Sequence, residues 1–283
     1  MASTPSTFPR YPDLHGKVAL ITGIGQSGAV SSTNWGNGAA IARILSTNGC
    51  AIFGCDLFLE AAQRTQSRLL EDRPDASIDV VSCDVTDLSA VEDIVKRCLD
   101  KHGKIDILIN NVGRSEPGDP ASMSPDVWGR QMDVNLKTVY NCCHTILPLM
   151  ERQGSGSIVN VASIVGQRYA GKPQVAYAAT KAAIIQFTKH TAVIYASRGV
   201  RMNVVVPGLI DTPLVQVLAD KYAGGDYEGF RKTRDAQVPT GRMGTSFDVA
   251  NAVAFLCSDA AAGYITGVDL VVDGGITLST GRT

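Results

Sequence analysis

Short apolar runs alternate with longer amphipathic segments along most of the chain. The runs are rich in Val and Ile and show little polar alternation, which is typical of parallel strands covered on both faces. They lie at 18–21, 51–55, 78–82, 105–109, 157–161, 201–206 and 268–272. Helical periodicity fills the intervals, at 39–47, 60–71, 89–101, 125–152, 175–197 and 246–259. The alternation predicts an α/β fold with a doubly wound parallel sheet of about seven strands.

No linker, repeat or low-complexity stretch divides this pattern, so we expect one domain over residues 1–283. Residues 1–16 precede the first strand and form an N-terminal extension. Residues 209–244 fall outside the repeating strand–helix order, and an insertion of this length predicts a small substrate lid. Its apolar side chains, Leu214 and Val215 among them, favour a largely apolar substrate, and packing onto the body or a neighbouring subunit is the alternative.

The composition is that of a globular protein, with 45% apolar and 19% charged residues. The 26 basic and 27 acidic residues leave a net charge of −1, so no basic surplus favours nucleic acid or a membrane surface as partner. The seven cysteines have no paired spacing that predicts a metal site, and free buried thiols indicate a reducing compartment. With no apolar signal segment at the N-terminus, we expect a cytoplasmic protein.

A glycine pattern, Gly23-x-Gly25-x-x-Gly28, follows the first predicted strand and matches the dinucleotide-binding fingerprint. Residues 29–38 show no helical periodicity, however, so the last glycine of this match does not open a helix. The helical pattern begins instead at a second glycine pair, which twelve residues separate from Gly23. The sequence therefore predicts a Rossmann-type dinucleotide cradle formed by Gly23, Gly36, Asn37 and Gly38.

Asp56 ends the second strand 18 residues after Gly38, where a carboxylate accepts the hydroxyls of the adenosine ribose and repels a 2′-phosphate. Leu57 follows it, with no cation to reverse that preference, so we expect NAD rather than NADP. A helix N-cap is the alternative role for Asp56. Residues that follow the third and fourth strands are expected near adenine and ribose; they are Asp84, Val85, Asn111, Val112 and Gly113.

Tyr177 and Lys181 lie one turn apart on one face of the predicted helix 175–197, and Ser163 closes the fifth strand. A phenol titrates at about 10 and is a poor base at neutral pH. We expect the ammonium of Lys181 and a cationic nicotinamide to lower the pKa of Tyr177 toward the working range. Such a phenol exchanges a proton with a hydroxyl or carbonyl oxygen while the cofactor moves the hydride.

In order and spacing, these residues resemble the short-chain dehydrogenase/reductase family over about 17–275. The motifs that carry the resemblance are Thr22-Gly23…Gly36-Asn37-Gly38, Cys83-Asp84-Val85, Asn110-Asn111-Val112-Gly113, Asn135, Ser163, Tyr177-x-x-x-Lys181, Pro207-Gly208, Tyr264-Ile265-Thr266-Gly267 and Val272-Asp273-Gly274-Gly275.

The resemblance implies a role for each catalytic candidate. Tyr177 is the general acid/base, and Lys181 lowers its pKa and binds the nicotinamide ribose. Ser163 orients the substrate oxygen, and Asn135 holds a water that links Lys181 to solvent. The resemblance also implies a nicotinamide-binding segment, with Ile210 and Thr212 as its main contacts after Pro207 and Gly208. Members of the family are homotetramers or homodimers that pair through the helices near Asn135 and Tyr177 and through the C-terminal strand.

The chain departs from the family between its first two cradle glycines, where the family has three residues and this chain has twelve. The extra residues within 24–35 either extend over the cofactor or form a flexible surface excursion. A long glycine loop also resembles the enoyl reductases of fatty-acid synthesis, whose Tyr–Lys spacing is wider than the one here.

The main hypothesis is an NAD(P)-dependent oxidoreductase, NAD(H) being preferred, that interconverts a secondary alcohol and its ketone. One alternative is a C=N or C=C reductase on the same fold. Another is a non-catalytic dinucleotide-binding sensor or scaffold, against which the complete set of catalytic candidates argues. Arg168, after the fifth strand, either contacts an anionic substrate or is a solvated loop residue.

Overall fold

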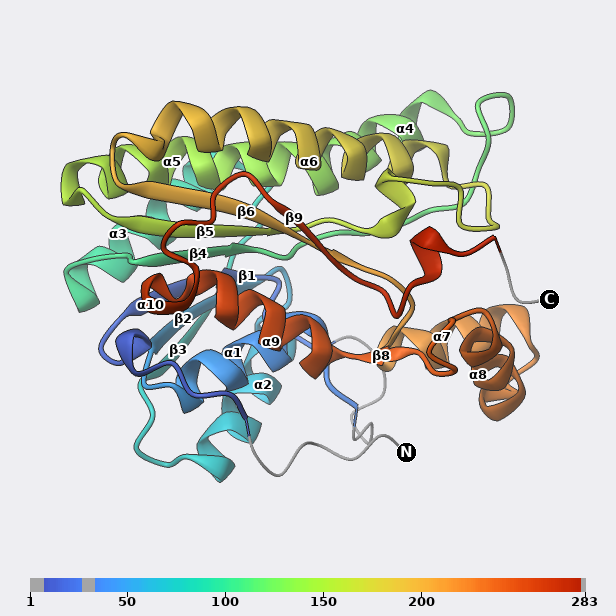
Figure 1. The fold of residues 1–283 in the computed structure, drawn as a ribbon, viewed down its shortest axis with the longest axis horizontal. Helices are drawn as coiled ribbons and strands as arrows, with labels where there is room; N and C mark the ends of the chain where they lie inside the picture. The colour runs from blue at the N-terminus through green and yellow to red at the C-terminus, as the bar shows by residue number, and fades with distance from the viewer. Residues whose placement is uncertain (1–7, 27–33, 281–283) are drawn as a thin grey trace.

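The computed structural model describes residues 8–26 and 34–280, and its centre is a parallel sheet with helices on both faces (Figure 1). In this described part the sheet has seven strands in the order β3-β2-β1-β4-β5-β6-β9. The predicted α/β fold is therefore confirmed. The strands are β1 (Val18–Thr22), β2 (Ala51–Asp56), β3 (Ile78–Ser82), β4 (Ile107–Asn110), β5 (Gly156–Val161), β6 (Val200–Pro207) and β9 (Asp269–Val272).

The sheet reverses its winding direction next to β1, which pairs with β2 on one side and β4 on the other. Thr22, the last residue of β1, is in register with Cys55 and with Asn110. The loops that leave β1 and β4 therefore diverge to opposite faces, and a crevice opens between their carboxyl ends. Gly23 and Asn111 are the first residues of these loops, so the predicted cradle lies at this switch point.

Two helical layers cover the sheet because consecutive side chains of each strand point to opposite faces. Ala19 and Ile21 pack into one core, whereas Val18 and Leu20 pack into the other. One layer consists of α1 (Asn37–Thr47), α2 (Leu59–Asp72) and α9 (Ser246–Cys257), and the other of α3 (Leu88–His102), α5 (Thr138–Gln153) and α6 (Val175–Ala196). The short α10 (Asp259–Ala262) follows α9.

One predicted helix is divided in the structure. The pattern over 125–152 becomes α4 (Pro125–Met132), a π-helical turn (Asp133–Lys137) and α5. A π-helical turn of five residues is too short to be distinguished within the longer helical pattern, so the sequence does not reveal it. This turn contains Asn135, so the irregular backbone lies at a predicted site residue.

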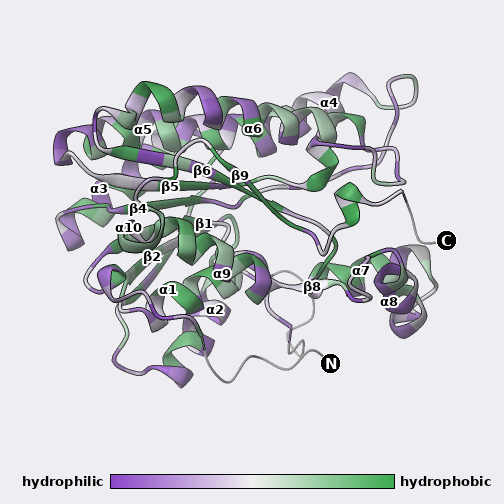
Figure 2. Ribbon diagram, viewed as in Figure 1, coloured by the Kyte–Doolittle hydropathy of each residue, from purple (hydrophilic) through white to green (hydrophobic). Residues whose placement is uncertain are grey.

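The 209–244 segment leaves the sheet after β6 and forms its own small substructure. It contains β7 (Ile210–Asp211), α7 (Pro213–Tyr222), α8 (Tyr227–Ala236) and the start of β8 (Gly244–Thr245). Because β7 pairs with β8, the two ends of the segment are held together. Figure 1 shows α7 and α8 near the end of β6, and Figure 2 shows α8 mostly hydrophilic, in contrast to β9.

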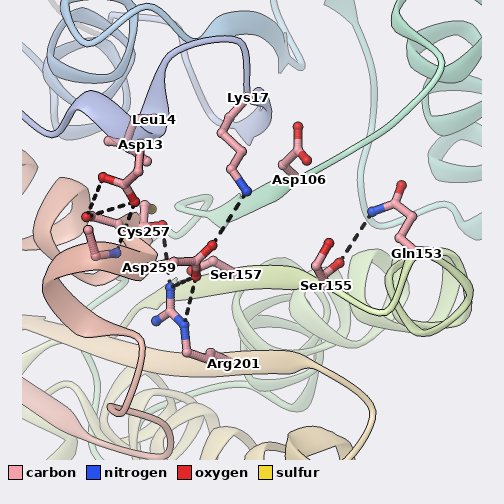
Figure 3. Close-up of polar contacts among 12 residues, drawn as sticks. Asp13, Leu14, Lys17, Asp106, Gln153, Ser155, Ser157, Arg201, Cys257 and Asp259 are labelled. Atoms are coloured by element: carbon pink, nitrogen blue, oxygen red, sulfur yellow. Dashed lines mark hydrogen bonds and ion pairs between the residues drawn. The ribbon is translucent and has the colours of Figure 1, made fainter.

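The amino ends of the strands are fastened by polar contacts (Figure 3). Asp13, from the N-terminal extension, accepts hydrogen bonds from the Ser258 hydroxyl at 2.8 Å and the Ala260 N–H at 3.1 Å. Arg201 of β6 forms an ion pair with Asp259 at 2.9 Å. The described part of the extension is therefore packed on this edge of the sheet. No helix in the described ranges is long and apolar enough to cross a membrane.

Candidate active site

Ser163, Tyr177 and Lys181 meet beyond the carboxyl end of β5. Ser163 begins a 3-10 turn (Ile164–Gly166), and its hydroxyl accepts the N–H of Val165 at 3.3 Å. This turn packs directly on α6, since a Cβ at Gly166 would lie 2.6 Å from the backbone nitrogen of Ala182. The close packing holds Ser163 beside the first turns of α6, where its side chain forms a hydrogen bond with Tyr177.

Lys181 is buried, with 2% of its surface exposed. Its Nζ donates a hydrogen bond to the carbonyl oxygen of Val161 at 2.8 Å and lies 5.6 Å from the ring centre of Tyr177. Burial lowers the pKa of Lys181 to about 8. The ammonium is therefore still the main form at neutral pH.

The phenol of Tyr177 behaves differently from the expectation. Burial raises its pKa to about 12, while the hydrogen bond with Ser163 acts in the opposite direction. The predicted low pKa is wrong for the protein without cofactor. Removing the phenolate from water destabilises it by more than the hydrogen bond with Ser163 stabilises it. At neutral pH Tyr177 therefore holds its proton.

We expect Lys181→Met to stabilise the fold at pH 7 while it removes the ammonium from the site. A pKa near 8 in place of 10.5 means that folding at neutral pH carries a desolvation cost of up to about 3 kcal/mol. The lost bond to Val161 offsets about 1 kcal/mol of the gain. Urea unfolding at pH 7 should therefore show a net stabilisation of about 1–2 kcal/mol.

The pH dependence of this stabilisation follows from the same shift. Between pH 8 and 10.5 the unfolded chain binds more protons at Lys181 than the folded chain does, so wild-type stability rises with pH. The advantage of the variant should accordingly shrink from pH 7 to pH 10. Lys96→Met, at an exposed position on α3, is the control and should show no such trend. A destabilised Lys181→Met at pH 7 would contradict this account.

Asn135 is fully buried in the π-helical turn. Its Oδ1 accepts the N–H of Arg114 at 2.9 Å, and its Nδ2 donates to the carbonyl oxygens of Arg114 and Gln131, both at 2.9 Å. A Cβ at Gly113 would lie 3.1 Å from both Asn135 Oδ1 and Lys181 Nζ. The structure thus brings Asn135 close to Lys181 across Gly113, and its role in holding a water stays a prediction.

The cradle is built where the second glycine pair predicts it. α1 begins at Asn37, with Gly36 as its N-cap, and glycine has no side chain to cap this end. The N–H of Gly36 itself donates to Gln26 Oε1 at 3.1 Å. Gly23 has a positive φ of 68°, and a Cβ at Gly38 would overlap its carbonyl oxygen. Gly28, the last glycine of the literal fingerprint, lies outside the described residues.

These features fit a nicotinamide dinucleotide. The backbone N–H groups in the first turn of α1 receive no cap bond from the N-cap residue Gly36, so a pyrophosphate can accept from them. The buried Oδ1 of Asn37 has no hydrogen-bond partner among the described residues, which leaves an acceptor for a ligand hydroxyl. Glycine at position 38 lets the first loop and the helix approach closely enough to form this cradle.

Asn111 connects the two strands that border the crevice. Its Nδ2 donates to the carbonyl oxygen of Gly23 at 2.9 Å, and its backbone N–H donates to the Thr22 hydroxyl at 3.2 Å. Val112 packs against the same turn, within 3.1 Å of where a Cβ of Gly23 would lie. The side chain of Asn111 therefore fixes the backbone of Gly23 in the cradle, and its contact with the cofactor stays a prediction.

Asp56 lies at the end of β2, as predicted, and both of its carboxylate oxygens accept backbone hydrogen bonds. Oδ2 accepts the N–H of Gly25 at 3.0 Å, and Oδ1 accepts that of Phe58 at 3.1 Å. α2 begins at Leu59 with Phe58 as its N-cap, so the alternative role of Asp56 as the N-cap is wrong. Leu57 and Phe58 are exposed beside it.

The loop after β3 is the remaining predicted wall of the adenosine site. Asp84 is exposed and accepts hydrogen bonds from the N–H of Thr86 at 3.0 Å and from its hydroxyl at 2.7 Å. Val85 is buried, and its carbonyl oxygen accepts from Asn141 at 3.0 Å. The structure places both residues beyond β3, and their contact with adenine stays a prediction.

The described ends of the 24–35 excursion are packed on the body. Ile24 is fully buried against Gly54. Trp35 is 6% exposed, with the guanidinium of Arg43 4.8 Å and that of Arg68 3.8 Å from its ring. Residues 27–33 lie outside the described part, so the expectations about their position over the cofactor stay untested.

The segment after β6 is anchored to the C-terminal strand. The N–H of Gly208, after Pro207, donates to the carbonyl oxygen of Val272 at 2.9 Å, and a Cβ at 208 would lie 2.6 Å from that of Asp273. Ile210 is buried, and Thr212 is the N-cap of α7 without using its side chain for the cap. The hydroxyl of Thr212 is therefore not used by this helix end.

Arg168 is exposed in the loop after β5, as one of the two interpretations predicts, and it also binds the C-terminal segment. Its Nη1 donates to the carbonyl oxygens of Ile276, Thr277 and Ser279 at 2.7, 3.0 and 2.9 Å. It therefore holds the C-terminal segment beside the turn that carries Ser163. Sequence reasoning missed this role because backbone carbonyl oxygens leave no signal in residue identity.

The described residues contain no group of three or more His, Cys, Asp or Glu that could hold a metal ion. All seven cysteines are buried free thiols, as the sequence predicts. The site therefore consists of the cradle, the crevice and the Ser163–Tyr177–Lys181 cluster.

Comparison with known proteins agrees with this arrangement. A family model described as "Enoyl-(Acyl carrier protein) reductase" matches residues 31–277. The 3-oxoacyl-[acyl-carrier-protein] reductase of Thermotoga maritima is 34% identical over 265 residues, which cover 94% of this chain and 99% of the relative.

Solved structures of similar sequence share the fold over nearly the whole chain. A putative short-chain dehydrogenase/reductase from Burkholderia xenovorans is 42% identical, with a TM-score of 0.88 over 94% of this chain and 98% of that one. A levodione reductase is 29% identical, with a TM-score of 0.86 over 94% and 99% of the two chains. The chain belongs to the short-chain dehydrogenase/reductase family, whose members are oxidoreductases that use a nicotinamide dinucleotide.

Proposed function

We propose that this chain interconverts a secondary alcohol and its ketone with NAD(H), and that Tyr177 is the general acid/base. The observation that carries the proposal is the partly buried phenol of Tyr177, hydrogen-bonded to Ser163 and flanked by the ammonium of Lys181. The names of two relatives, a 3-oxoacyl reductase and a levodione reductase, support a carbonyl compound as substrate.

The three side chains divide the proton chemistry between them. Because Tyr177 holds its proton at neutral pH, it donates to a carbonyl oxygen as negative charge develops there. The hydroxyl of Ser163 orients that same oxygen. The ammonium of Lys181, 5.6 Å from the ring centre of Tyr177, stabilises the phenolate that remains. In this proposal Lys181 also binds the nicotinamide ribose. The nicotinamide, when bound, supplies or accepts the hydride.

The preference for NAD over NADP is proposed from the surroundings of Asp56. Each of its oxygens accepts one backbone N–H and keeps capacity for a ribose hydroxyl. Two cations of α2 are used elsewhere: Arg64 donates to the carbonyl oxygen of Gln26 at 2.8 Å, and Arg68 stacks on Trp35. Neither arginine therefore offsets the negative charge of Asp56, and the carboxylate repels a 2′-phosphate.

We propose that the 209–244 segment covers a largely apolar substrate. Leu214 and Val217 of α7 are half exposed, at 51% and 44%, which leaves apolar surface for a ligand to cover. A homotetramer or homodimer and a cytoplasmic location complete the proposal. Exposed apolar side chains on α4, α5 and α6 support subunit pairing; they are Trp128, Tyr140, Val193 and Ile194.

The experiment that tests the function follows NADH or NADPH formation across a panel of aliphatic, cyclic and aromatic secondary alcohols. Calorimetry on the same sample measures the binding of each cofactor. We expect turnover with NAD and tighter binding of NAD than of NADP. Binding without turnover on any alcohol or ketone would favour the sensor or the C=C reductase instead, and failure to bind either cofactor would overturn the proposal.

A further inference from the structure

A polar cluster joins the dinucleotide cradle to the 209–244 segment. Its centre is the carboxylate of Asp211 in β7, whose side chain is only 8% exposed. The Tyr227 hydroxyl donates to Asp211 Oδ1 at 2.8 Å, and the Asn34 Nδ2 lies 3.4 Å from both the Tyr227 oxygen and Asp211 Oδ1. Arg231 Nε lies 3.6 Å from the other oxygen, Oδ2.

Asn34 is itself fixed to the body of the protein. Its carbonyl oxygen accepts from Arg68 at 3.3 Å, and the next residue, Trp35, stacks on that same guanidinium. The carbonyl oxygen of Trp35 accepts a hydrogen bond from the hydroxyl of Ser246, at the start of α9. Gly36, the N-cap of α1, follows at once. Asn34 therefore moves with the cradle.

Asp211 belongs to the other side of the cluster, the 209–244 segment. It lies between Ile210 and Thr212, the two residues proposed to contact the nicotinamide, and its backbone is paired with Thr245 of β8. A displacement of the Asp211 backbone would therefore move both neighbours. Tyr227 begins α8, so the cluster also determines where this helix lies.

We infer that Asn34 and Tyr227 are positioning residues, which hold Asp211 so that Ile210 and Thr212 face the nicotinamide of a dinucleotide bound in the cradle. The inference rests on the proposed function. Since one cluster contacts both the cradle and the 209–244 segment, dinucleotide binding and ordering of α7 and α8 should strengthen each other.

Three substitutions test the cluster. Tyr227→Phe removes one hydroxyl and keeps the ring, and Asn34→Ala removes the amide; each should raise the KM for NAD(H) about 3- to 10-fold. Asn34→Asp has nearly the same shape as the natural side chain but faces Asp211 with a second negative charge. It should raise KM more than Asn34→Ala does, a ranking that a purely steric role would reverse.

Hydrogen exchange supplies a readout that does not depend on turnover. In the wild type, NAD(H) should slow exchange in α7 and α8, and in the three variants this slowing should be lost or clearly reduced. Gln216→Ala is the matched control, because the exposed Gln216 of α7 donates to Asp220 at 2.9 Å and takes no part in the cluster. It should keep both the KM and the exchange pattern of the wild type.

The outcomes separate this inference from the function itself. Wild-type KM and exchange in Tyr227→Phe and Asn34→Asp would overturn the positioning role while leaving the oxidoreductase intact. A wild-type protein that binds no nicotinamide dinucleotide would overturn both. Equal changes in Gln216→Ala and in the cluster variants would also overturn the inference, since the effect would then belong to α7 in general.

Discussion

Tyr177→Phe is expected to lower turnover by on the order of 10²–10⁴-fold, the usual contribution of a positioned general acid or base. The substitution removes only the hydroxyl that exchanges the proton, and the ring continues to pack beside Lys181. Binding of NAD(H), measured by calorimetry, should change by less than about threefold, since one neutral hydrogen bond contributes little net free energy. The variant should fold as the wild type does.

Two comparisons make this result decisive. Tyr264→Phe removes a hydroxyl from a fully exposed ring and should leave turnover unchanged. A C=C or C=N reductase that takes its proton from another group would keep most of its activity in Tyr177→Phe. Full retention of activity on a ketone would contradict the assignment of Tyr177 as the acid.

Gly38→Ala should have the second large effect. A Cβ at this position overlaps the carbonyl oxygen of Gly23 and lies 2.8 Å from the Nδ2 of Asn111. Both are parts of the packed cradle, so the first loop must move away from α1. Overpacking of this kind costs about 1–3 kcal/mol. We expect NAD(H) affinity to fall about 10- to 100-fold, by the conversion of 1.4 kcal/mol per factor of ten.

The control for this prediction is Gly129→Ala in α4, where a Cβ would meet no atom within 4 Å. There alanine favours the helix and should preserve or slightly raise stability, without a change in cofactor binding. Calorimetry for affinity and urea unfolding for stability check both variants. Normal affinity in Gly38→Ala would mean that the dinucleotide does not bind between Gly23 and α1.

The sequence by itself predicted the sheet and its order of elements. A strand covered on both faces has no polar face, so β1 and β4 to β6 remain visible as apolar runs. The start of α1 was also predictable. Its backbone approaches that of Gly23 so closely that position 38 must be glycine, and this glycine is visible in the sequence. The meeting of Ser163 with the first turns of α6 followed from the carboxyl ends of parallel strands sharing one edge.

Other features were decided only by the tertiary structure. The pKa values of Tyr177 and Lys181 depend on how completely the fold removes both groups from water, and the helical spacing of the two residues carries no information about burial. The π-helical turn at Asn135 spans only five residues within a longer helical pattern. Arg168 binds carbonyl oxygens, which every residue has.

The cluster of Asn34, Asp211 and Tyr227 is the clearest case. Its members are separated by up to 193 residues, and each is an ordinary polar residue in its local sequence. Local pattern therefore determined the strands, the helices and the cradle, because burial and backbone geometry constrain residue type position by position. Long-range polar contacts and desolvation were determined by the fold alone, because they depend on which segments meet and on how much water their meeting excludes.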